Sequence, residues 1–131
     1  MNTKILVAAA LEARALAYAP YSHFSVGAAL LTSDGRIFKG CNVENLSYGL
    51  TLCAERSALA AAVSAGCLAF DTIAIVADTD SPISPCGACR QVLAEFSPSL
   101  KIICANLTGA QETFSLETLL PRAKTGILNT P

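Results

Sequence analysis

The segment FDTIAIVA, residues 70–77, constrains the fold more than any other part of the sequence. It is a run of β-branched and apolar residues that is interrupted only by Asp71 and Thr72. A short run of this kind is typical of a strand that is buried on both faces of a sheet. The segment therefore predicts a sheet that is covered by helices on both sides.

The flanking residues predict the remaining elements. Ser33-Asp34-Gly35 separates two apolar runs, and an Asp-Gly pair in such a place indicates a β-hairpin. Further strands are expected over 101–107 and around 112–114. Helices are expected near the N-terminus, from about residue 53 to 65, over 86–96 and over 116–120, with Gly66 ending the second. The expected order is α-β-β-α-β-α-β-β-α.

The chain has 131 residues, which is the size of a single domain spanning 1–131. Hydrophobic residues make up 53% and charged residues 15%, so little surface is left for solvation, and a homo-oligomer is expected. Nine Lys and Arg stand against ten Asp and Glu, and the pI is about 5.7. This balance leaves no basic stripe for a phosphate backbone, so we expect no nucleic-acid partner.

The N-terminal residues superficially resemble a signal peptide. Glu12 and Arg14 break the apolar stretch, and Leu6, Ala13 and Leu16 recur at helical spacing, so an amphipathic helix capped by Asn2 or Thr3 is the better interpretation. No apolar run approaches the length of a membrane span. Without an export signal, the six cysteines are expected to be reduced thiols in a cytoplasmic protein.

Three cysteines are expected to meet at one edge of the sheet. Two of the predicted helices connect parallel strands, and right-handed crossovers start such helices at the same sheet edge. Open α/β sheets keep their sites at that edge. Cys53 begins the second helix and Cys86 and Cys89 begin the third, where Ser84-Pro85 provides a plausible cap and first-turn proline. Two helix dipoles would stabilise the thiolates that zinc requires.

Three protein ligands leave one tetrahedral position open, which is typical of a catalytic zinc. The single histidine, His23, lies far away in the sequence, in a turn. The other cysteines, Cys41, Cys67 and Cys104, lie in or beside apolar segments and are interpreted as small core residues.

Charged residues crowd the start of the second helix. Glu55 could take a proton from water at the metal and return it to a substrate nitrogen, or it could simply be a favourable first-turn acid. Arg56 can reach back to the Cys53 sulfur and reduce the charge of three thiolates, and Arg90 could do the same from the third helix. The alternative is that both arginines are ordinary surface residues.

A lone Cys-x-x-C pair would fit a redox dithiol or half of a structural zinc site equally well. Cys-Ala-Glu followed downstream by Pro-Cys-x-x-Cys is more specific, because it matches the three-cysteine form of the zinc-deaminase pattern.

Nearly the whole chain resembles the small, homotetrameric cytidine deaminases of pyrimidine salvage. The segments that carry this resemblance are YAPYSHFSVGAAL, GCNVENLSYGLTLCAERSAL and SPCGACRQV. The resemblance implies a three-layer α/β/α sandwich with a five-stranded mixed sheet. It also implies one Zn²⁺ per chain and hydrolysis of cytidine or deoxycytidine to uridine or deoxyuridine plus ammonia.

The resemblance carries over residue by residue. It implies that Glu55 shuttles protons, that Phe24 packs against the nucleoside and that the Ala54 backbone contacts the pyrimidine ring. In the family, Tyr48 and the backbone at Leu46 reach a neighbouring subunit's site. The implied zinc ligands are Cys53, Cys86 and Cys89, the pair gripping the ribose 3′-hydroxyl is Asn42 and Glu44, and Arg56 bonds the ligand sulfurs.

One position departs from the family pattern. The family usually has a phenylalanine three residues after its Leu-Leu-Pro, where it stacks on the base in the adjoining subunit, but this chain has Lys124 there. Either Ile127 substitutes, or stacking is weaker, or the pocket takes a different ligand. Base–aromatic stacking contributes about 1–3 kcal/mol per base. We therefore expect a raised KM for cytidine.

Three alternatives remain open. The first is a deaminase of a modified nucleoside such as blasticidin S, which the intact NVEN disfavours and Lys124 keeps open. The second is a nucleic-acid editing deaminase, although those enzymes generally have histidine in place of Cys53. The third is a structural zinc or redox module without catalytic activity.

Overall fold

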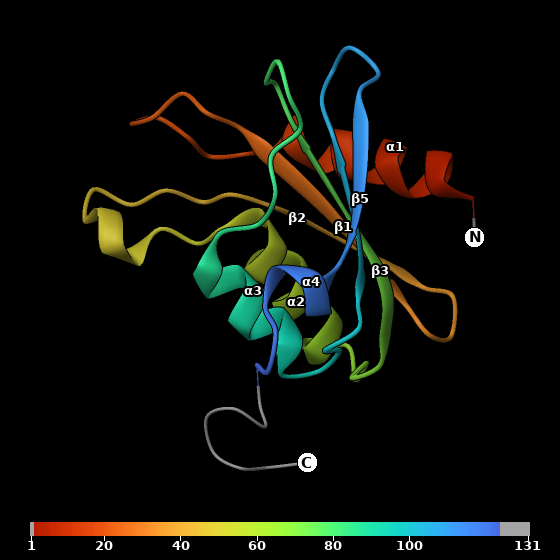
Figure 1. Ribbon diagram of the computed structural model, residues 1–131. Helices are drawn as coiled ribbons and strands as arrows, with labels where there is room; N and C mark the ends of the chain where they lie inside the picture. Colours follow the sequence, from red (N-terminus) through yellow and green to blue (C-terminus); the bar gives the residue numbers. More distant parts are fainter. Residues whose placement is uncertain (1, 124–131) are drawn as a thin grey trace.

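Five strands form one mixed sheet at the centre of the molecule in the computed structural model, which describes residues 2–123 (Figure 1). The strand order is β2-β1-β3-β4-β5, in which β3 and β4 are parallel and the other neighbours are antiparallel. The elements are α1 (Thr3–Arg14), β1 (Val26–Thr32), β2 (Ile37–Cys41), the 3₁₀ helix η1 (Tyr48–Leu50), α2 (Ala54–Ser64), β3 (Phe70–Ala77), α3 (Gly87–Ala94), β4 (Lys101–Ala105), β5 (Gln111–Ser115) and α4 (Leu116–Leu119).

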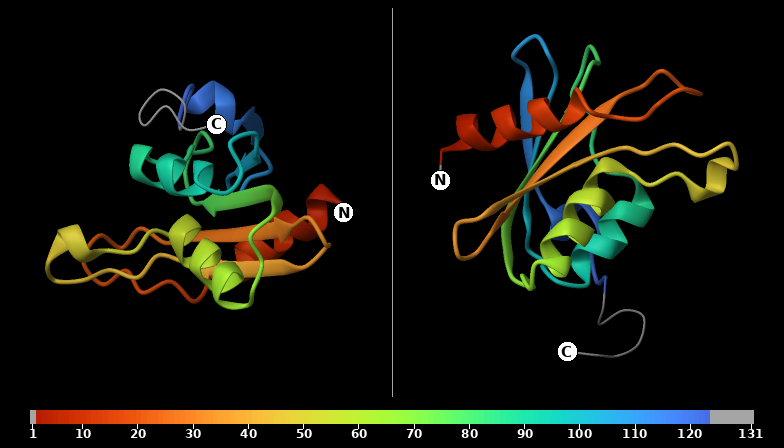
Figure 2. Two further views of the ribbon diagram at one scale, coloured as in Figure 1. Left: turned by 90° about the horizontal axis from the view of Figure 1, so that it is seen from below. Right: turned by 180° about the vertical axis from the view of Figure 1, so that it is seen from behind.

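Helices cover both faces of the sheet, with α1 on one face and α2, α3 and α4 on the other (Figures 1 and 2). The alternation within β3 follows these layers. Ile73 and Ile75 lie in the core beneath α2 and α3, whereas Ala74 and Val76 pack in the core with Leu6 of α1. The expected three-layer α/β/α arrangement around a doubly buried central strand is confirmed.

The first helix begins as predicted, because the Asn2 side chain accepts a hydrogen bond from the Lys4 amide at 2.8 Å. Leu6 and Ala13 lie on its buried face. The prediction that Leu16 shares this face is wrong. The helix ends at Arg14, so Leu16 lies beyond its last turn and its side chain is 78% exposed.

The hairpin β1–β2 turns at Gly35, whose φ of +91° lies in the left-handed region that glycine favours. At the other end of β2, Gly40 lets the first turns of α2 lie directly on the strand. A Cβ atom at Gly40 would lie 2.3 Å from the Ala58 nitrogen and 2.6 Å from the Ala54 oxygen. Gly40 therefore fixes how closely the start of α2 approaches the sheet.

The two helices that carry the cysteines start at the same edge of the sheet. Strands β2 and β3 are both antiparallel to β1, so they are parallel to each other and are joined by α2. Strands β3 and β4 are parallel neighbours joined by α3. Both connections are the crossovers predicted from the sequence.

Two extended segments, 18–24 and 42–52, project together beyond this edge of the sheet (Figure 2). Isolated bridges join Tyr18 to Val43 and Val43 to Leu52, and the Glu44 amide donates to the Tyr18 carbonyl at 2.9 Å. The projection is therefore tied together by backbone hydrogen bonds. Among residues 2–123, none of the helices is long and apolar enough to cross a membrane.

Candidate functional site

Three cysteine sulfurs converge where α2 and α3 begin. Cys53 and Cys86 are the N-cap residues of the two helices, and Cys89 lies in the first turn of α3. The three Sγ atoms all lie within 4.8 Å of one another, and those of Cys86 and Cys89 are 3.4 Å apart. All three cysteines are free thiols. The structure thus brings together the three residues that the sequence predicted to meet.

The donor set fits a zinc ion. Zn–S bonds of about 2.3 Å in tetrahedral geometry separate the sulfurs by roughly 3.8 Å, which is close to the spacing here. Burial opposes ionisation of Cys86, but hydrogen bonds from the Cys89 amide and the Cys89 and Cys53 thiols outweigh it and lower the pKa of Cys86. Burial, followed by the charges of Glu55 and the other cysteines, raises the pKa of Cys89. A divalent cation among the sulfurs would offset this repulsion.

Arg56 lies against the cluster as predicted. Its Nη2 donates to the Cys53 sulfur at 3.3 Å and to the Thr51 carbonyl at 3.4 Å. Its Nε is buried without a hydrogen-bond partner among the described residues. The guanidinium charge is therefore held next to a cysteine sulfur, with its Nε shielded from solvent.

Glu55 follows Cys53 in the first turn of α2 and its side chain is only 6% exposed. Burial raises the pKa of its carboxyl, and this effect is opposed by hydrogen bonds from its own amide and from the Cys89 thiol and by the charge of Arg56. A buried carboxyl with a raised pKa can both accept and return a proton near neutral pH.

A cavity of about 250 Å³ opens onto Cys53, Cys86 and Glu55. Its lining includes the candidate residues Phe24, Asn42, Cys53, Ala54, Glu55 and Cys86, and also Val26, Thr51, Ile83 and Ser84. Sequence reasoning did not identify the last four as cavity residues. The only available signal was their position, because Thr51 lies two residues before Cys53, and Ile83 and Ser84 lie just before Cys86.

Asn42 lies in the cavity wall and also anchors the start of β1. Its Oδ1 accepts from the Val26 amide at 2.9 Å and its Nδ2 donates to the Phe24 carbonyl at 2.8 Å. An amide side chain has two donors and two acceptor positions, so one of each is left over. Asn42 can therefore hold the wall and still bind a hydroxyl group in the cavity.

Glu44 and Tyr48 lie in the projection and not in the lining of this cavity. The Glu44 carboxylate accepts from the amides of Tyr21 and Ser22 at 3.0 and 3.1 Å, and also from the Ser22 hydroxyl. The Ser22 hydroxyl and these amides lower the pKa of Glu44. The Tyr48 ring is 74% exposed and packs edge-on against Tyr21.

Arg90 does not point to the sulfurs, in contrast to the expectation. Its Nε donates to the Pro85 carbonyl at 2.7 Å, its Nη1 to the Leu119 carbonyl at 3.0 Å and its Nη2 to the Ser84 hydroxyl at 3.1 Å. The prediction that Ser84 and Pro85 form the cap and first turn of α3 is also wrong, because the N-cap of α3 is Cys86. Arg90 therefore ties α4 to the segment before Cys86.

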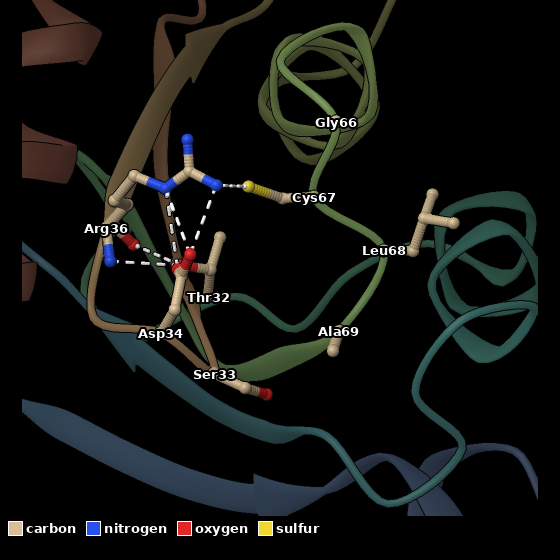
Figure 3. A pocket seen from close by; sticks show the side chains of 8 residues that line it. All are labelled: Thr32, Ser33, Asp34, Arg36, Gly66, Cys67, Leu68 and Ala69. Carbon is tan, nitrogen blue, oxygen red and sulfur yellow. Dashed lines mark hydrogen bonds and ion pairs between the residues drawn. The ribbon is translucent and has the colours of Figure 1, made fainter.

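A second cavity of about 240 Å³ lies beyond the other end of α2 (Figure 3). It is lined by the β1–β2 turn and by residues 66–69. Arg36 donates to the carboxylate of Asp34 and lies against the Cys67 sulfur. This cavity contains a single sulfur, so the described residues offer no set of metal ligands there.

Comparison with known proteins agrees with the geometry of the first cavity. The sequence profile of the cytidine and deoxycytidylate deaminase zinc-binding region matches residues 1–106. The chain belongs to this deaminase family. Because Cys53, Cys86 and Cys89 fall within the matched zinc-binding region and form a metal-compatible cluster, Zn²⁺ is the cofactor.

Individual relatives of the deaminase family match over most of the chain. The cytidine deaminase of Sporosarcina psychrophila is 52% identical over 124 residues, covering 94% of this chain and 91% of that protein. The crystal structure of cytidine deaminase from Burkholderia pseudomallei is 52% identical, with a TM-score of 0.91, covering 95% of this chain and 100% of that one. The cytidine deaminase from Mycobacterium tuberculosis is 45% identical, with a TM-score of 0.81, covering 92% and 95%.

Proposed function

We propose that the protein hydrolyses cytidine and 2′-deoxycytidine to uridine and 2′-deoxyuridine, releasing ammonia. The observation that carries this proposal is a cluster of three cysteine sulfurs, two of whose cysteines line a cavity of about 250 Å³ together with a buried carboxyl. A nucleoside-sized cavity with these groups is suited to metal-assisted hydrolysis. The family to which the chain belongs supports the same reaction.

Cys53, Cys86 and Cys89 would hold the zinc, with their thiolates at two helix N-termini, where the helix dipoles favour negative charge. When bound, zinc supplies a Lewis acid that activates water at neutral pH. Arg56 offsets part of the negative charge of the three thiolates through its bond to the Cys53 sulfur. Arg56 thereby limits how far the three thiolates would weaken the Lewis acidity of the bound zinc.

Glu55 moves the protons. Its carboxylate accepts a proton from the attacking water and delivers it to ring N3 of cytosine, which makes C4 more electrophilic. After water has added at C4, the Glu55 carboxylate takes the proton of the new C4 hydroxyl and passes it to the departing amine. The C4–N bond then breaks, ammonia leaves and C4 becomes a carbonyl. Burial keeps this carboxyl out of bulk water and raises its pKa, which suits a group that must take and give a proton in one cycle.

The nucleoside is held by the other wall of the cavity. Phe24 packs against it, and the Ala54 backbone at the start of α2 contacts the pyrimidine ring. Asn42 has one donor and one acceptor left for the sugar 3′-hydroxyl. Glu44 keeps one lone-pair position free after three hydrogen bonds from residues 21 and 22, and it binds the same hydroxyl.

We further propose a homotetramer in which subunits share their sites. Leu46, Tyr48 and Leu50 are 77%, 74% and 71% exposed on the projection, which is an unusual concentration of large apolar side chains in water. In the assembly, Tyr48 and the backbone of Leu46 reach a neighbouring subunit's cavity. Light scattering would test this assembly, with a mass of four chains expected. We also propose a role in cytoplasmic pyrimidine salvage, because free cysteines are typical of a reducing compartment and the proposed reaction converts one pyrimidine nucleoside into another.

Lys124 lies outside the described residues. We propose that the residue at this point of the sequence affects how the base is held. A lysine cannot stack on the base as the family's phenylalanine does, so we expect Lys124→Phe to lower the KM for cytidine by roughly 5- to 150-fold. An unchanged KM would mean that stacking at this position is not limiting. Lys124 also supports a second candidate, a deaminase of a modified cytosine nucleoside resembling blasticidin S.

A substrate panel tests the proposal. Cytidine, deoxycytidine, dCMP, cytosine and blasticidin S are offered separately, and deamination is followed by ultraviolet absorbance. We expect turnover of cytidine and deoxycytidine and little turnover of dCMP and free cytosine. Preferential turnover of blasticidin S would favour the second candidate, and no turnover of any compound would contradict both.

A further inference from the structure

The segment between β3 and α3, residues 78–85, forms one wall of the first cavity. Ile83 and Ser84 line the cavity, and Cys86 follows directly. The segment has no regular secondary structure, so its position depends on side chains from elsewhere.

Asn106 holds the beginning of this segment. Its Nδ2 donates to the carbonyls of Thr79 and Asp80, each at 3.0 Å, and its Oδ1 accepts from the amides of Thr108 and Ala110 at 3.0 and 2.9 Å. An amide has two donors and two acceptor positions, and all four are used here by a side chain on a residue only 6% exposed. The β4–β5 turn and the segment after β3 lie side by side at this end of the sheet (Figures 1 and 2).

The end of the segment is held independently. Arg90 binds the Pro85 carbonyl and the Ser84 hydroxyl, and its amide donates to the Cys86 carbonyl at 3.0 Å. Releasing the beginning of the segment therefore leaves the residues next to the cysteine cluster in place. Any displacement would be concentrated between residues 79 and 83, at the wall that faces the nucleoside.

We propose that Asn106 is a positioning residue that sets substrate affinity by fixing the cavity wall at Ile83. It does so without touching substrate or metal. This inference rests on the proposed nucleoside deamination for its kinetic consequence, but the position of the wall can be measured without turnover.

The substitution Asn106→Asp separates the two functions of this side chain. It keeps the acceptor oxygens for the β4–β5 turn, removes both donors and sets a carboxylate against two carbonyl oxygens. We expect the KM for cytidine to rise about 10-fold or more, because small displacements of binding groups weaken productive contacts. We expect kcat and the zinc content per chain to stay within about twofold of the wild-type values.

Gly109→Ala is the matched control. Gly109 has a φ of +95°, so alanine strains the β4–β5 turn but leaves the bonds from Asn106 to Thr79 and Asp80 in place. Its KM is expected to equal that of the wild type. The inference is overturned if Asn106→Asp leaves KM unchanged, or if it lowers kcat and zinc content as well as raising KM. It is also overturned if Gly109→Ala raises KM equally.

Crystal structures of the wild type and of Asn106→Asp provide the readout that is independent of turnover. The substitution should displace residues 79–83 and leave α3 in place, whereas an unchanged path of residues 79–83 would contradict the inference. Should this variant fail to fold, Asn106→Ala removes the same donors without adding a charge. Because it also removes the acceptor for the amides of Thr108 and Ala110, its effects are compared with those of Gly109→Ala, which strains the same turn. An inactive wild type would refute the proposed function alone, because the comparison of structures would still decide the role of Asn106.

Discussion

The two ends of α2 lie at two cavities of nearly equal size and similar composition. The cavity at its N-terminus is lined by Cys53 and the carboxylate Glu55, and Arg56 lies against the Cys53 sulfur. The cavity beyond its C-terminus has the same three residue types in Cys67, Arg36 and Asp34. Residue types and volume therefore do not distinguish a catalytic site from an ordinary surface pocket.

What differs is convergence, burial and the sign of the helix dipole. At the N-terminus, two further sulfurs reach Cys53 from α3, and the partial positive charge of two helix starts favours thiolates. The carboxylate there is 6% exposed, whereas the Asp34 side chain is 60% exposed and paired with a half-exposed arginine. Of these two cavities, as lined by the described residues, the first alone combines a metal-binding set with a carboxyl whose pKa is raised by burial.

Replacing a cysteine by alanine at each end of α2 should produce the largest difference in zinc content and deamination rate. Cys53→Ala removes one of three metal ligands, so we expect zinc binding to fall below one ion per chain and deamination to be lost. Cys67→Ala should retain one zinc and the wild-type rate. The Cys67 sulfur lies against Arg36 and does not belong to the cluster of three cysteine sulfurs. Metal analysis and a cytidine assay measure both variants, and equal zinc loss in the two would contradict the contrast.

The arginines should give a smaller contrast. Arg56→Ala removes the hydrogen bond to the Cys53 sulfur, and loss of such outer contacts weakens metal affinity or activity by about 10- to 100-fold. Arg36→Ala breaks a surface ion pair and a contact over the Phe38 ring, and should leave both properties unchanged. Zinc competition with a chelator measures the difference. Equal affinities for the two variants would show that Arg56 is only a structural residue.

Asp34 should produce the smallest effect, limited to stability at acid pH. Hydrogen bonds from Thr32 and Arg36 lower the pKa of its carboxyl below the ordinary 3.8. A lowered folded pKa stabilises the protein above the unfolded pKa, and this contribution disappears as the pH falls through the folded pKa. Thermal unfolding of wild type and Asp34→Asn should therefore differ slightly at neutral pH and converge in acid. A difference that persists in strong acid would exclude the ionised carboxylate as its source.

Much of this arrangement was predictable from local patterns. The run FDTIAIVA predicted β3 and the layers around it, and Asp34-Gly35 predicted the hairpin, because both signals depend on nearby residues. The convergence of the cysteines also followed, since the handedness of crossovers fixes where helices start.

Long side-chain contacts could not be predicted in this way. Arg90 and Arg56 each follow a cysteine-containing motif, yet Arg90 binds carbonyls of Pro85 and Leu119 because the end of α4 packs beside it. The four hydrogen bonds of Asn106 likewise join two loops that the sequence separates by more than twenty residues. Leu16 was misplaced for a local reason, because helix ends are less sharply encoded than helix centres.

Glu55→Gln tests the central claim most directly, because it removes the proton-carrying group and retains the size of the side chain. Zinc content and the rate of cytidine deamination are measured on the same preparation, with Asp34→Asn as the control. We predict one zinc ion per chain in both variants, a rate at least about 100-fold below wild type for Glu55→Gln, and a wild-type rate for Asp34→Asn. A zinc-loaded Glu55→Gln protein that deaminates cytidine at the wild-type rate would contradict the proposed mechanism.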